Sequence, residues 1–179
     1  GGQTLTPIDE KSTRAALQSA YDQGLRAVAI AFLHAYLNPA HEERAADIAR
    51  QIGFTQVSAS HQVSRLAKMV GRGDTTVVDA YLSPILTRYV RQVAGALDLG
   101  GDCDRLLFMQ SNGGLTDAAL FQGKDAILSG PAGGIVGMVK TAAAAGCDKV
   151  IGFDMGGTST DVSHYAGDYD RSLDRKSVV

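Results

Sequence analysis

One stretch constrains the fold of this chain more than any other: an apolar run that leads into a glycine pair between two aspartates, residues 150–162 (VIGFDMGGTSTDV). The run up to Phe153 has the composition of a buried strand, and it delivers Asp154 to Gly156 and Gly157. Because glycine has no Cβ and adopts backbone angles closed to other residues, main-chain N–H groups at such a turn can close on an anionic oxygen. The stretch therefore predicts a phosphate-binding loop.

The polar residues of this stretch predict what kind of phosphate it holds. Two carboxylates, Asp154 and Asp161, would repel a triphosphate directly, so we expect a Mg²⁺ ion between them and the phosphates, held partly through water. Either aspartate could instead orient a water molecule or accept a proton, and the sequence leaves that choice open. The predicted ligand is ATP with Mg²⁺, and the expected nucleotide contacts are Gly156, Gly157, Thr158, Ser159 and Thr160.

The segment after the glycines distinguishes this loop from the two commonest nucleotide-binding motifs. In a P-loop or a dinucleotide-binding fingerprint the glycines open a helix, whereas Thr160 to Tyr165 has a strand-like composition and precedes a turn at Gly167. The chain contains neither a Gly-Lys-Ser/Thr sequence nor G-x-G-x-x-G. We therefore expect the glycines to form the tip of a β-hairpin, with an ordinary Gly-Gly hairpin as the alternative.

These residues resemble the hydantoinase A/5-oxoprolinase family, within the superfamily of actin, sugar kinases and heat-shock ATPases. The resemblance runs from one end of the chain to the other, and residues 154–167 look closest to the 5-oxoprolinase branch. Four further segments carry it: residues 27–42 (AVAIAFLHAYLNPAHE), 75–89 (TTVVDAYLSPILTRY), 109–115 (MQSNGGL) and 129–137 (SGPAGGIVG).

The resemblance implies an α/β fold of the actin-like ATPase (ribonuclease H-like) type, present in part. Residues 1–128 would form the C-terminal part of the first lobe, residues 129–149 a hinge helix, and residues 150–179 the start of the second lobe with its phosphate-binding hairpin. Members of the family are much longer and carry another glycine-rich phosphate loop near their own N-terminus, which no segment of this chain matches. The chain is therefore interpreted as an internal fragment with little activity of its own.

The same resemblance implies an enzyme that couples ATP hydrolysis to the opening of a cyclic amide such as 5-oxoproline or a hydantoin. Phosphate transfer to the amide oxygen would make that oxygen a leaving group and let water open the ring. The implied partners are the small substrate and a hydantoinase B-type module or subunit, and a homo-oligomer is compatible with it. A small-molecule kinase of the same superfamily and a non-catalytic, nucleotide-switched binding module are the alternatives, which the reaction product would separate.

Two other glycine-rich segments are candidate binding elements. Ser111, Asn112, Gly113 and Gly114 follow the apolar run 106–110, where an α/β sheet exposes backbone to ligands. They are candidate substrate contacts, and a plain turn is the equal alternative.

The segment 129–137 predicts a helix that begins near Pro131 and leads to the hairpin. Each glycine inside a helix destabilises it by roughly 1 kcal/mol, so something should approach this backbone closely. A tightly packed second helix is the first explanation, and an anion at the helix N-terminus is the second. Gly133 and Gly134 are accordingly candidate nucleotide-binding residues.

Alternating helix and strand patterns precede these motifs. Helical spacing spans residues 6–23, with Thr6 as the expected cap, and then the segment from Asn38 to Gly53. The apolar runs at 25–33 and 57–59 have the composition of buried strands. Such alternation predicts an α/β sheet with crossover helices.

A long helix is expected from Asp74, its predicted cap, to the glycines at 100–101, with Pro84 kinking or dividing it. Arg72 and Asp74 are interpreted as a solvated charge pair in preference to substrate contacts. An apolar stripe at helical spacing is predicted to face the core. Its members are Val78, Tyr81, Leu82, Ile85, Tyr89 and Val93.

Composition and charge argue against several other functions. A formal net charge of −2 is not that of a nucleic-acid-binding protein, and no run approaches the ~18–20 apolar residues of a membrane span. Cys103 and Cys147 are expected to remain thiols, and without a signal-peptide pattern the expected compartment is the cytoplasm. His34, His41 and His61 show no compact metal-ligand spacing; the first two are expected at junctions, and His61 is a minor ligand candidate at a strand end.

Overall fold

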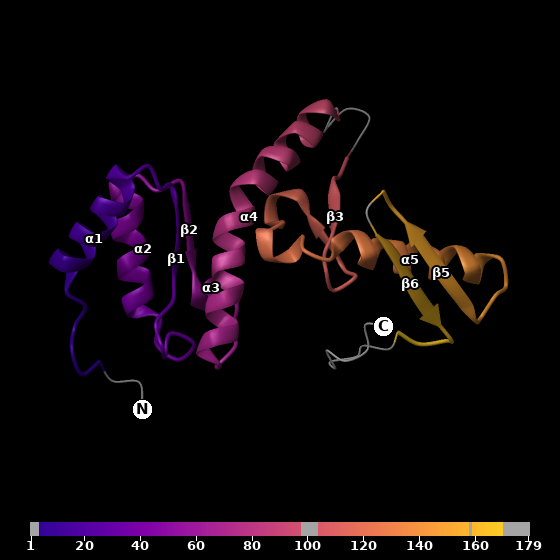
Figure 1. The fold of residues 1–179 in the computed structure, drawn as a ribbon, viewed down its shortest axis with the longest axis horizontal. Coiled ribbons are helices and arrows are strands. Elements are labelled where there is room, and N and C mark those ends of the chain that lie inside the picture. The colour runs from indigo at the N-terminus through magenta and orange to yellow at the C-terminus, as the bar shows by residue number, and fades with distance from the viewer. Residues whose placement is uncertain (1–3, 98–103, 158, 170–179) are drawn as a thin grey trace.

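The computed structural model describes residues 4–97, 104–157 and 159–169. Within them the chain is a mixed α/β structure with three two-stranded sheets, β1-β2, β3-β4 and β5-β6. Figure 1 shows these pairs following one another from left to right, with the long helix α4 between the first pair and the other two. The predicted α/β class is confirmed, but the strands form separate pairs.

The N-terminal part consists of α1 (Glu10–Asp22), β1 (Ala27–Ile30), α2 (Ala40–Ile52) and β2 (Gln56–Ala59). The two strands are parallel, in register from Ala27 opposite Gln56 to Ile30 opposite Ala59, as the alternating pattern predicts. Helix α2 connects them and buries Ala45 and Ala46 against Ile30. This small core packs α2 against the β1–β2 pair.

Short polar side chains and a glycine set the ends of the first two helices. The carboxylate of Asp9 accepts hydrogen bonds from two N–H groups of the first turn of α1, so Asp9 is the cap and the prediction for Thr6 was wrong. Asp9 takes this role because its side chain stands one residue before the unpaired N–H groups. Helix α2 begins just after Asn38 and ends at Gly53, whose φ is 115°, as predicted.

A short helix, α3 (Ser60–Val63), follows β2, and α4 runs from Met69 to Ala96. Helix α4 begins earlier than predicted, after Lys68, so Asp74 lies exposed inside the helix and does not cap it. Its first turn is fixed by Arg72, whose backbone N–H donates to the Lys68 carbonyl at 3.1 Å and whose side chain is buried. The helix continues through Pro84, so of the two expected effects, a kink or a division, the division does not occur.

The buried face of α4 is polar, which the apolar pattern did not indicate. Residues three or four apart on one helix face are buried: Arg72, Thr76, Asp79, Ala80 and Ser83. Three members of the stripe predicted as core are exposed, Tyr81 by 73%, Ile85 by 59% and Tyr89 by 54%. For these three residues the prediction was wrong, because the neighbouring strand presents hydrogen-bonding groups to another face of α4, where Ser58 Oγ donates to Asp79 at 2.7 Å. The other three members of the stripe are half-buried: Val78, Leu82 and Val93.

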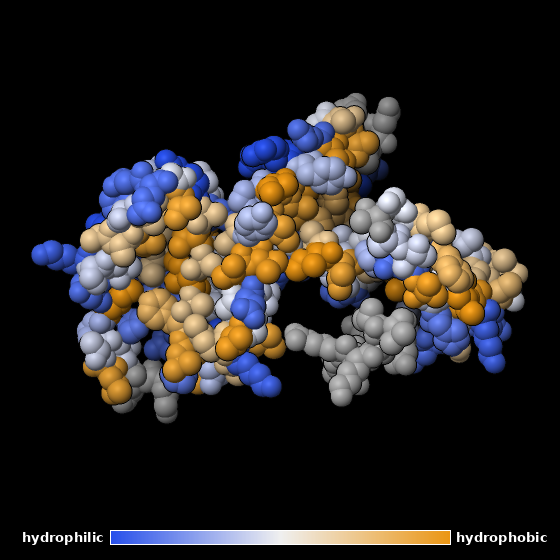
Figure 2. Space-filling model, viewed as in Figure 1, coloured by the Kyte–Doolittle hydropathy of each residue, from blue (hydrophilic) through white to orange (hydrophobic). Residues whose placement is uncertain are grey.

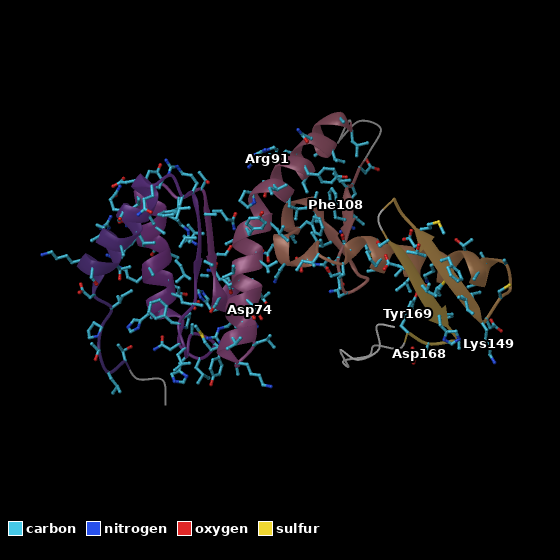
Figure 3. All side chains as sticks on the ribbon, in the orientation of Figure 1. Asp74, Arg91, Phe108, Lys149, Asp168 and Tyr169 are labelled. Carbon is cyan, nitrogen blue, oxygen red and sulfur yellow. The ribbon has the colours of Figure 1, made fainter. Side chains whose placement is uncertain are left out.

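An antiparallel hairpin of β3 (Leu107–Met109) and β4 (Leu115–Asp117) follows, and two short turns, η1 (Ala118–Leu120) and η2 (Gly123–Asp125), return the chain to α4. The η2 segment packs closely on α4, since a Cβ on Gly123 would lie 2.7 Å from the backbone nitrogen of Ser83 in that helix. Phe108 stacks on Phe121 with ring centroids 5.0 Å apart, and Figure 3 shows Phe108 beside α4. The β3–β4 turn is thereby anchored to the long helix.

The last part consists of α5 (Ser129–Ala144) and the antiparallel hairpin of β5 (Val150–Met155) and β6 (Thr160–Tyr165). Figure 1 shows the hairpin lying along α5. The helix and the hairpin were both predicted. The outer face of the hairpin is apolar and exposed, with Ile151, Phe153 and Met155 exposed by 66%, 71% and 77%, and Figure 2 shows hydrophobic residues gathered there.

Candidate functional site

The β5–β6 hairpin places its glycines at one end. The strands stay paired up to Met155 opposite Thr160, and the N–H of Gly156 donates to the carbonyl of Ser159 at 3.0 Å. Gly156 and Gly157 therefore lie in the turn that joins β5 to β6, as the sequence predicts. Of the predicted phosphate contacts, the described part of the tip holds Gly156, Gly157 and Ser159, and Thr160 begins β6. Thr158 lies outside the described residues.

Asp154 and Asp161 are direct cross-strand partners, one pair before the last. Directly opposed residues of antiparallel strands point to the same face with their Cβ atoms ~5 Å apart, so the two carboxylates stand side by side. Both residues are exposed. Like charges in this arrangement destabilise a hairpin, and a bound cation would remove that repulsion.

Helix α5 approaches this pair at Gly134. A Cβ there would lie 2.8 Å from Oδ2 of Asp154, so any larger residue would make this carboxylate move. The close approach inferred from the glycines is therefore made by the hairpin; the expectation of a second tightly packed helix is not met among the described residues. A Cβ on Gly133 would lie 3.6 Å from the Met109 side chain, and one on Gly137 would meet no described atom within 4 Å.

A cleft of about 480 Å³ lies between α5 and the hairpin. Asp154, Asp161, Gly134 and Met138 help to line it, and no Lys, Arg or His is among its described lining residues. The described residues contain no group of three or more His, Cys, Asp or Glu side chains that could hold a metal alone. Two carboxylates at an open cleft fit Mg²⁺, which is bound through one or two carboxylates together with phosphates and water.

A second pocket, of about 430 Å³, contains other predicted residues: Ser111, Asn112 and Gly113 line it together with residues of α5 and β6. Gly114 is not in its lining; the N–H of Gly114 donates to Oδ1 of Asn112 at 2.7 Å and shapes the turn. Gly113 has a φ of 83°, which requires glycine. The turn is therefore present, at the tip of an antiparallel hairpin, and contact with a substrate remains a prediction.

A buried polar cluster at the carboxyl ends of β1 and β2 was not predicted. Glu42 is 0% exposed, and its carboxylate accepts hydrogen bonds from the Phe32 N–H at 2.7 Å and from Ser60 Oγ. The other carboxylate oxygen accepts the His61 N–H at 2.9 Å and lies 2.7 Å from Nδ1 of that ring. Burial raises the pKa of the Glu42 carboxyl, but the hydrogen bonds from Ser60, His61 and Phe32 outweigh it, so this pKa lies below its ordinary value.

Arg72 completes the cluster and is also 0% exposed, so its interpretation as part of a solvated charge pair was wrong. Its guanidinium donates to Ser60 Oγ at 2.9 Å. It also donates to the backbone carbonyls of Phe32, Leu33, Leu66 and Ala67. These bonds brace the loop after β1. The sequence offered one signal, the helical spacing of Arg72 with Thr76 and Asp79.

The other predicted residues lie mostly where expected. His34 is in the turn after β1, where its carbonyl accepts the Leu37 N–H at 3.0 Å, and His41 is in the first turn of α2. Cys147 is a free, exposed thiol, and Cys103 lies outside the described residues. In the part of the chain that the structure describes, no helix has the length and apolar character needed to cross a membrane.

Comparison with known proteins adds two family matches. The hydantoinase/oxoprolinase model matches residues 72–177, and the model of the hydantoinase/oxoprolinase N-terminal region matches residues 1–53. The chain is 46% identical over 162 residues to 5-oxoprolinase of Saccharomyces cerevisiae, which covers 88% of this chain and 12% of that protein. It is 36% identical over 165 residues to caprolactamase subunit alpha of Pseudomonas jessenii, which covers 90% of this chain and 24% of the relative.

Two solved structures are similar. The ATP-dependent caprolactamase of Pseudomonas jessenii superposes with a TM-score of 0.76 at 36% sequence identity, over 91% of this chain and 24% of that one. A nucleotide-free acetone carboxylase superposes with a TM-score of 0.80 at 24% identity, over the same shares of each chain, and at that identity the likeness concerns the fold alone. The chain thus spans between 12% and 24% of the length of these proteins.

Proposed function

The chain belongs to the hydantoinase/oxoprolinase family, in which it resembles the 5-oxoprolinase branch, and on this basis we propose that it is part of an ATP-dependent hydrolase of cyclic amides. One observation carries the proposal: Asp154 and Asp161 stand opposite each other in a cleft where Gly134 leaves room for a carboxylate. The related proteins named 5-oxoprolinase and ATP-dependent caprolactamase support the class of reaction.

The residues of the hairpin would act by binding and positioning. Asp154 and Asp161 would hold Mg²⁺, partly through water, while Gly156, Gly157, Thr158, Ser159 and Thr160 would contact the phosphates. Gly134 would keep the backbone of α5 open to the same cleft, whereas the Cβ position of Gly133 faces Met109 and Gly133 does not line the cleft. ATP would supply the phosphoryl group that turns the amide oxygen into a leaving group, and the protein would contribute alignment and charge neutralisation without a nucleophile of its own.

We further propose that the chain is an internal part of a longer enzyme with an actin-like ATPase fold. Residues 1–128 would end the first lobe, residues 129–149 would form the hinge helix, and residues 150–179 would begin the second lobe. The small share of each relative that the chain covers supports this, as does the exposed apolar face of the hairpin.

A partner subunit or module is part of the proposal. The caprolactamase relative is named as a subunit alpha, which supports a second component, here of hydantoinase B type. The segment Ser111 to Gly114 would contribute to binding the cyclic amide, because three of its residues line a pocket beside α5.

The test is a phosphate-release assay of the full-length protein with 5-oxoproline, hydantoin and caprolactam. We expect release of free phosphate that depends on one of these amides, together with the ring-opened product. A stable phosphate ester would instead identify a kinase. ATP-dependent partner binding without turnover would identify a nucleotide-switched binding module.

Asp154→Ala should lower this phosphate release by about 100-fold or more while leaving the circular dichroism spectrum unchanged, because alignment and charge neutralisation supply most of the catalysis. Asp168→Ala is the matched control. Figure 3 shows Asp168 at the base of the hairpin, away from its tip, and it does not line the cleft. Near-wild-type turnover in the Asp154 variant would contradict the proposed role.

A further inference from the structure

Two neighbouring pockets beside α5 carry opposite charges. The cleft that contains Asp154 and Asp161 has no cationic side chain among its described lining residues. The pocket beside the β3–β4 turn is lined by Lys140 and His164, and by no Asp or Glu among the residues described. Ile135 and Ser163 line both spaces. A metal cation suits the first space, and an anionic group suits the second.

The second pocket has one apolar wall and one polar wall. Ala132, Ile135 and Val136 of α5 provide the apolar side. On the polar side, Ser111 Oγ donates to the Asp125 carbonyl at 2.7 Å and Oδ1 of Asn112 accepts the Gly114 N–H at 2.7 Å, so the turn there is held in place. Its volume of about 430 Å³ is in the range of small-molecule sites. A small ring could therefore pack on α5 while its polar substituents meet the other residues.

Lys140 is the formal positive charge of this pocket, and within the described residues its ammonium group makes no hydrogen bond or ion pair. By contrast, Nζ of Lys124 donates to the Val63 carbonyl at 2.6 Å, and Arg72 is fully engaged in the buried cluster. An ammonium without a protein partner at the edge of a pocket is available to a ligand. A carboxylate would accept charge-assisted hydrogen bonds from it.

We propose that Lys140 binds the carboxylate of an acid-bearing cyclic amide whose ring packs against Ile135 and Val136. This inference rests on the proposed function, because it places the cyclic amide in the pocket beside the cleft that is proposed to bind ATP. Lys140 is then a specificity-determining residue: it favours a lactam that carries an acid group over the same ring without one.

The test measures equilibrium binding by calorimetry in the full-length protein, with 5-oxoproline and with 2-pyrrolidinone, the same ring without the carboxylate. Lys140→Met should weaken 5-oxoproline binding by about 10-fold or more, as expected for the loss of a hydrogen bond to a charged group, and leave 2-pyrrolidinone binding unchanged. Lys140→Arg keeps the charge and should stay close to wild type. The control is Lys149→Met, which Figure 3 shows at the base of the hairpin and which does not line the pocket.

The proposal is overturned if Lys140→Met binds 5-oxoproline as wild type does, if both ligands weaken equally, or if wild-type protein does not prefer the acid. Phosphate release is measured in parallel and tests a different claim. If no cyclic amide stimulates ATP turnover but 5-oxoproline binding still depends on Lys140, then the proposed reaction fails and the anion subsite stands. If turnover is stimulated while binding ignores Lys140, then the reaction stands and the subsite fails.

Discussion

Among single residues, Asp154 and Asp161 are directly opposed carboxylates whose repulsion destabilises the hairpin. A bound cation would offset this repulsion. Without Mg²⁺ and nucleotide, Asp161→Asn should therefore stabilise the protein by roughly 0.2–1 kcal/mol, the size of one cross-strand pair. The melting temperature should rise in the metal-free protein, and the advantage over wild type should shrink when Mg²⁺ and ATP are added. A lower melting temperature in the metal-free variant would show that the two carboxylates do not repel.

Gly134 gives a second residue-scale prediction. Gly134→Ala places a methyl group 2.8 Å from Oδ2 of Asp154, so the carboxylate must move and ATP turnover should fall by about 10-fold or more. Gly137→Ala is the matched control on the same helix, because its Cβ meets no described atom within 4 Å. It should leave turnover unchanged and stabilise the helix by ~0.5–1 kcal/mol. Equal turnover in the two variants would contradict the contact.

Part of this site could be predicted from the sequence, because local backbone chemistry decides it. The glycine pair specifies a tip, and the strand-like residues on either side specify a hairpin, so Asp154 and Asp161 necessarily come close together. The contact of Gly134 with Asp154 depends on how α5 packs on the hairpin, and no local pattern encodes that distance. The sequence indicated that something approaches Gly134 without indicating what.

At the scale of elements, the buried cluster around Glu42 and Arg72 holds the loop after β1 to the start of α4. Arg72→Met would leave Ser60 and several carbonyls without their donor, at a local cost of about 3–5 kcal/mol. Hydrogen exchange of the backbone around Phe32 should accelerate accordingly. Arg91→Met, on an exposed part of the same helix in Figure 3, should change exchange by less than about 0.5 kcal/mol. Unchanged protection in the Arg72 variant would show that the cluster does not brace the loop.

The same cluster predicts a dependence on pH. The pKa of Glu42 is lower in the folded protein than its ordinary value, because the hydrogen bonds from Ser60, His61 and Phe32 outweigh the opposing effect of burial. Its stabilising contribution is therefore complete above the unfolded pKa of about 4.3, and it is lost as the pH falls through the lower folded value.

Hydrogen exchange around Phe32, corrected for the intrinsic exchange rate, should lose protection as the pH falls from about 5 to about 3. In the Glu42→Gln variant these amides should already be less protected at neutral pH. Their protection should then decrease less between about pH 5 and about pH 3 than in the wild type, because the titrating carboxyl is absent. Identical pH profiles for the two proteins would exclude Glu42 as the titrating group.

Helix α4 shows why element-scale prediction failed in one place. Tyr81, Ile85 and Tyr89 have the spacing of a core stripe, yet the face with Arg72 and Asp79 is the buried one. Hydrophobic periodicity assumes that the surface packed against a helix is apolar. Here β2 and η2 present hydroxyl and backbone groups, such as the Ser58 hydroxyl on Asp79, so polar residues face inward. By contrast, α2 buries Ala45 and Ala46 against the apolar Ile30, so its apolar side chains face inward there.

At the scale of the whole molecule, the chain leaves large apolar side chains exposed over α4 and the β5–β6 hairpin. Because it spans between 12% and 24% of its relatives, we expect the rest of a longer enzyme to supply the other half of the nucleotide clamp. The chain of residues 1–179 alone should therefore show less than about 1% of the amide-dependent phosphate release of the full-length protein, since alignment of both substrates is lost. Comparable turnover per molecule in the two preparations would contradict the division into lobes.

If Asp154 and Asp161 bind ATP through Mg²⁺, then the affinity for the nucleotide must depend on the metal through these two carboxylates. Calorimetry with full-length wild type should show tight binding of ATP with Mg²⁺ and much weaker binding with a chelator, because two carboxylates repel the bare triphosphate. In the Asp154→Asn, Asp161→Asn variant the affinity with Mg²⁺ should fall by about 10-fold or more, while the affinity without it stays equal or improves. If the variant keeps the full wild-type gain in ATP affinity from Mg²⁺, then the hairpin does not hold the metal.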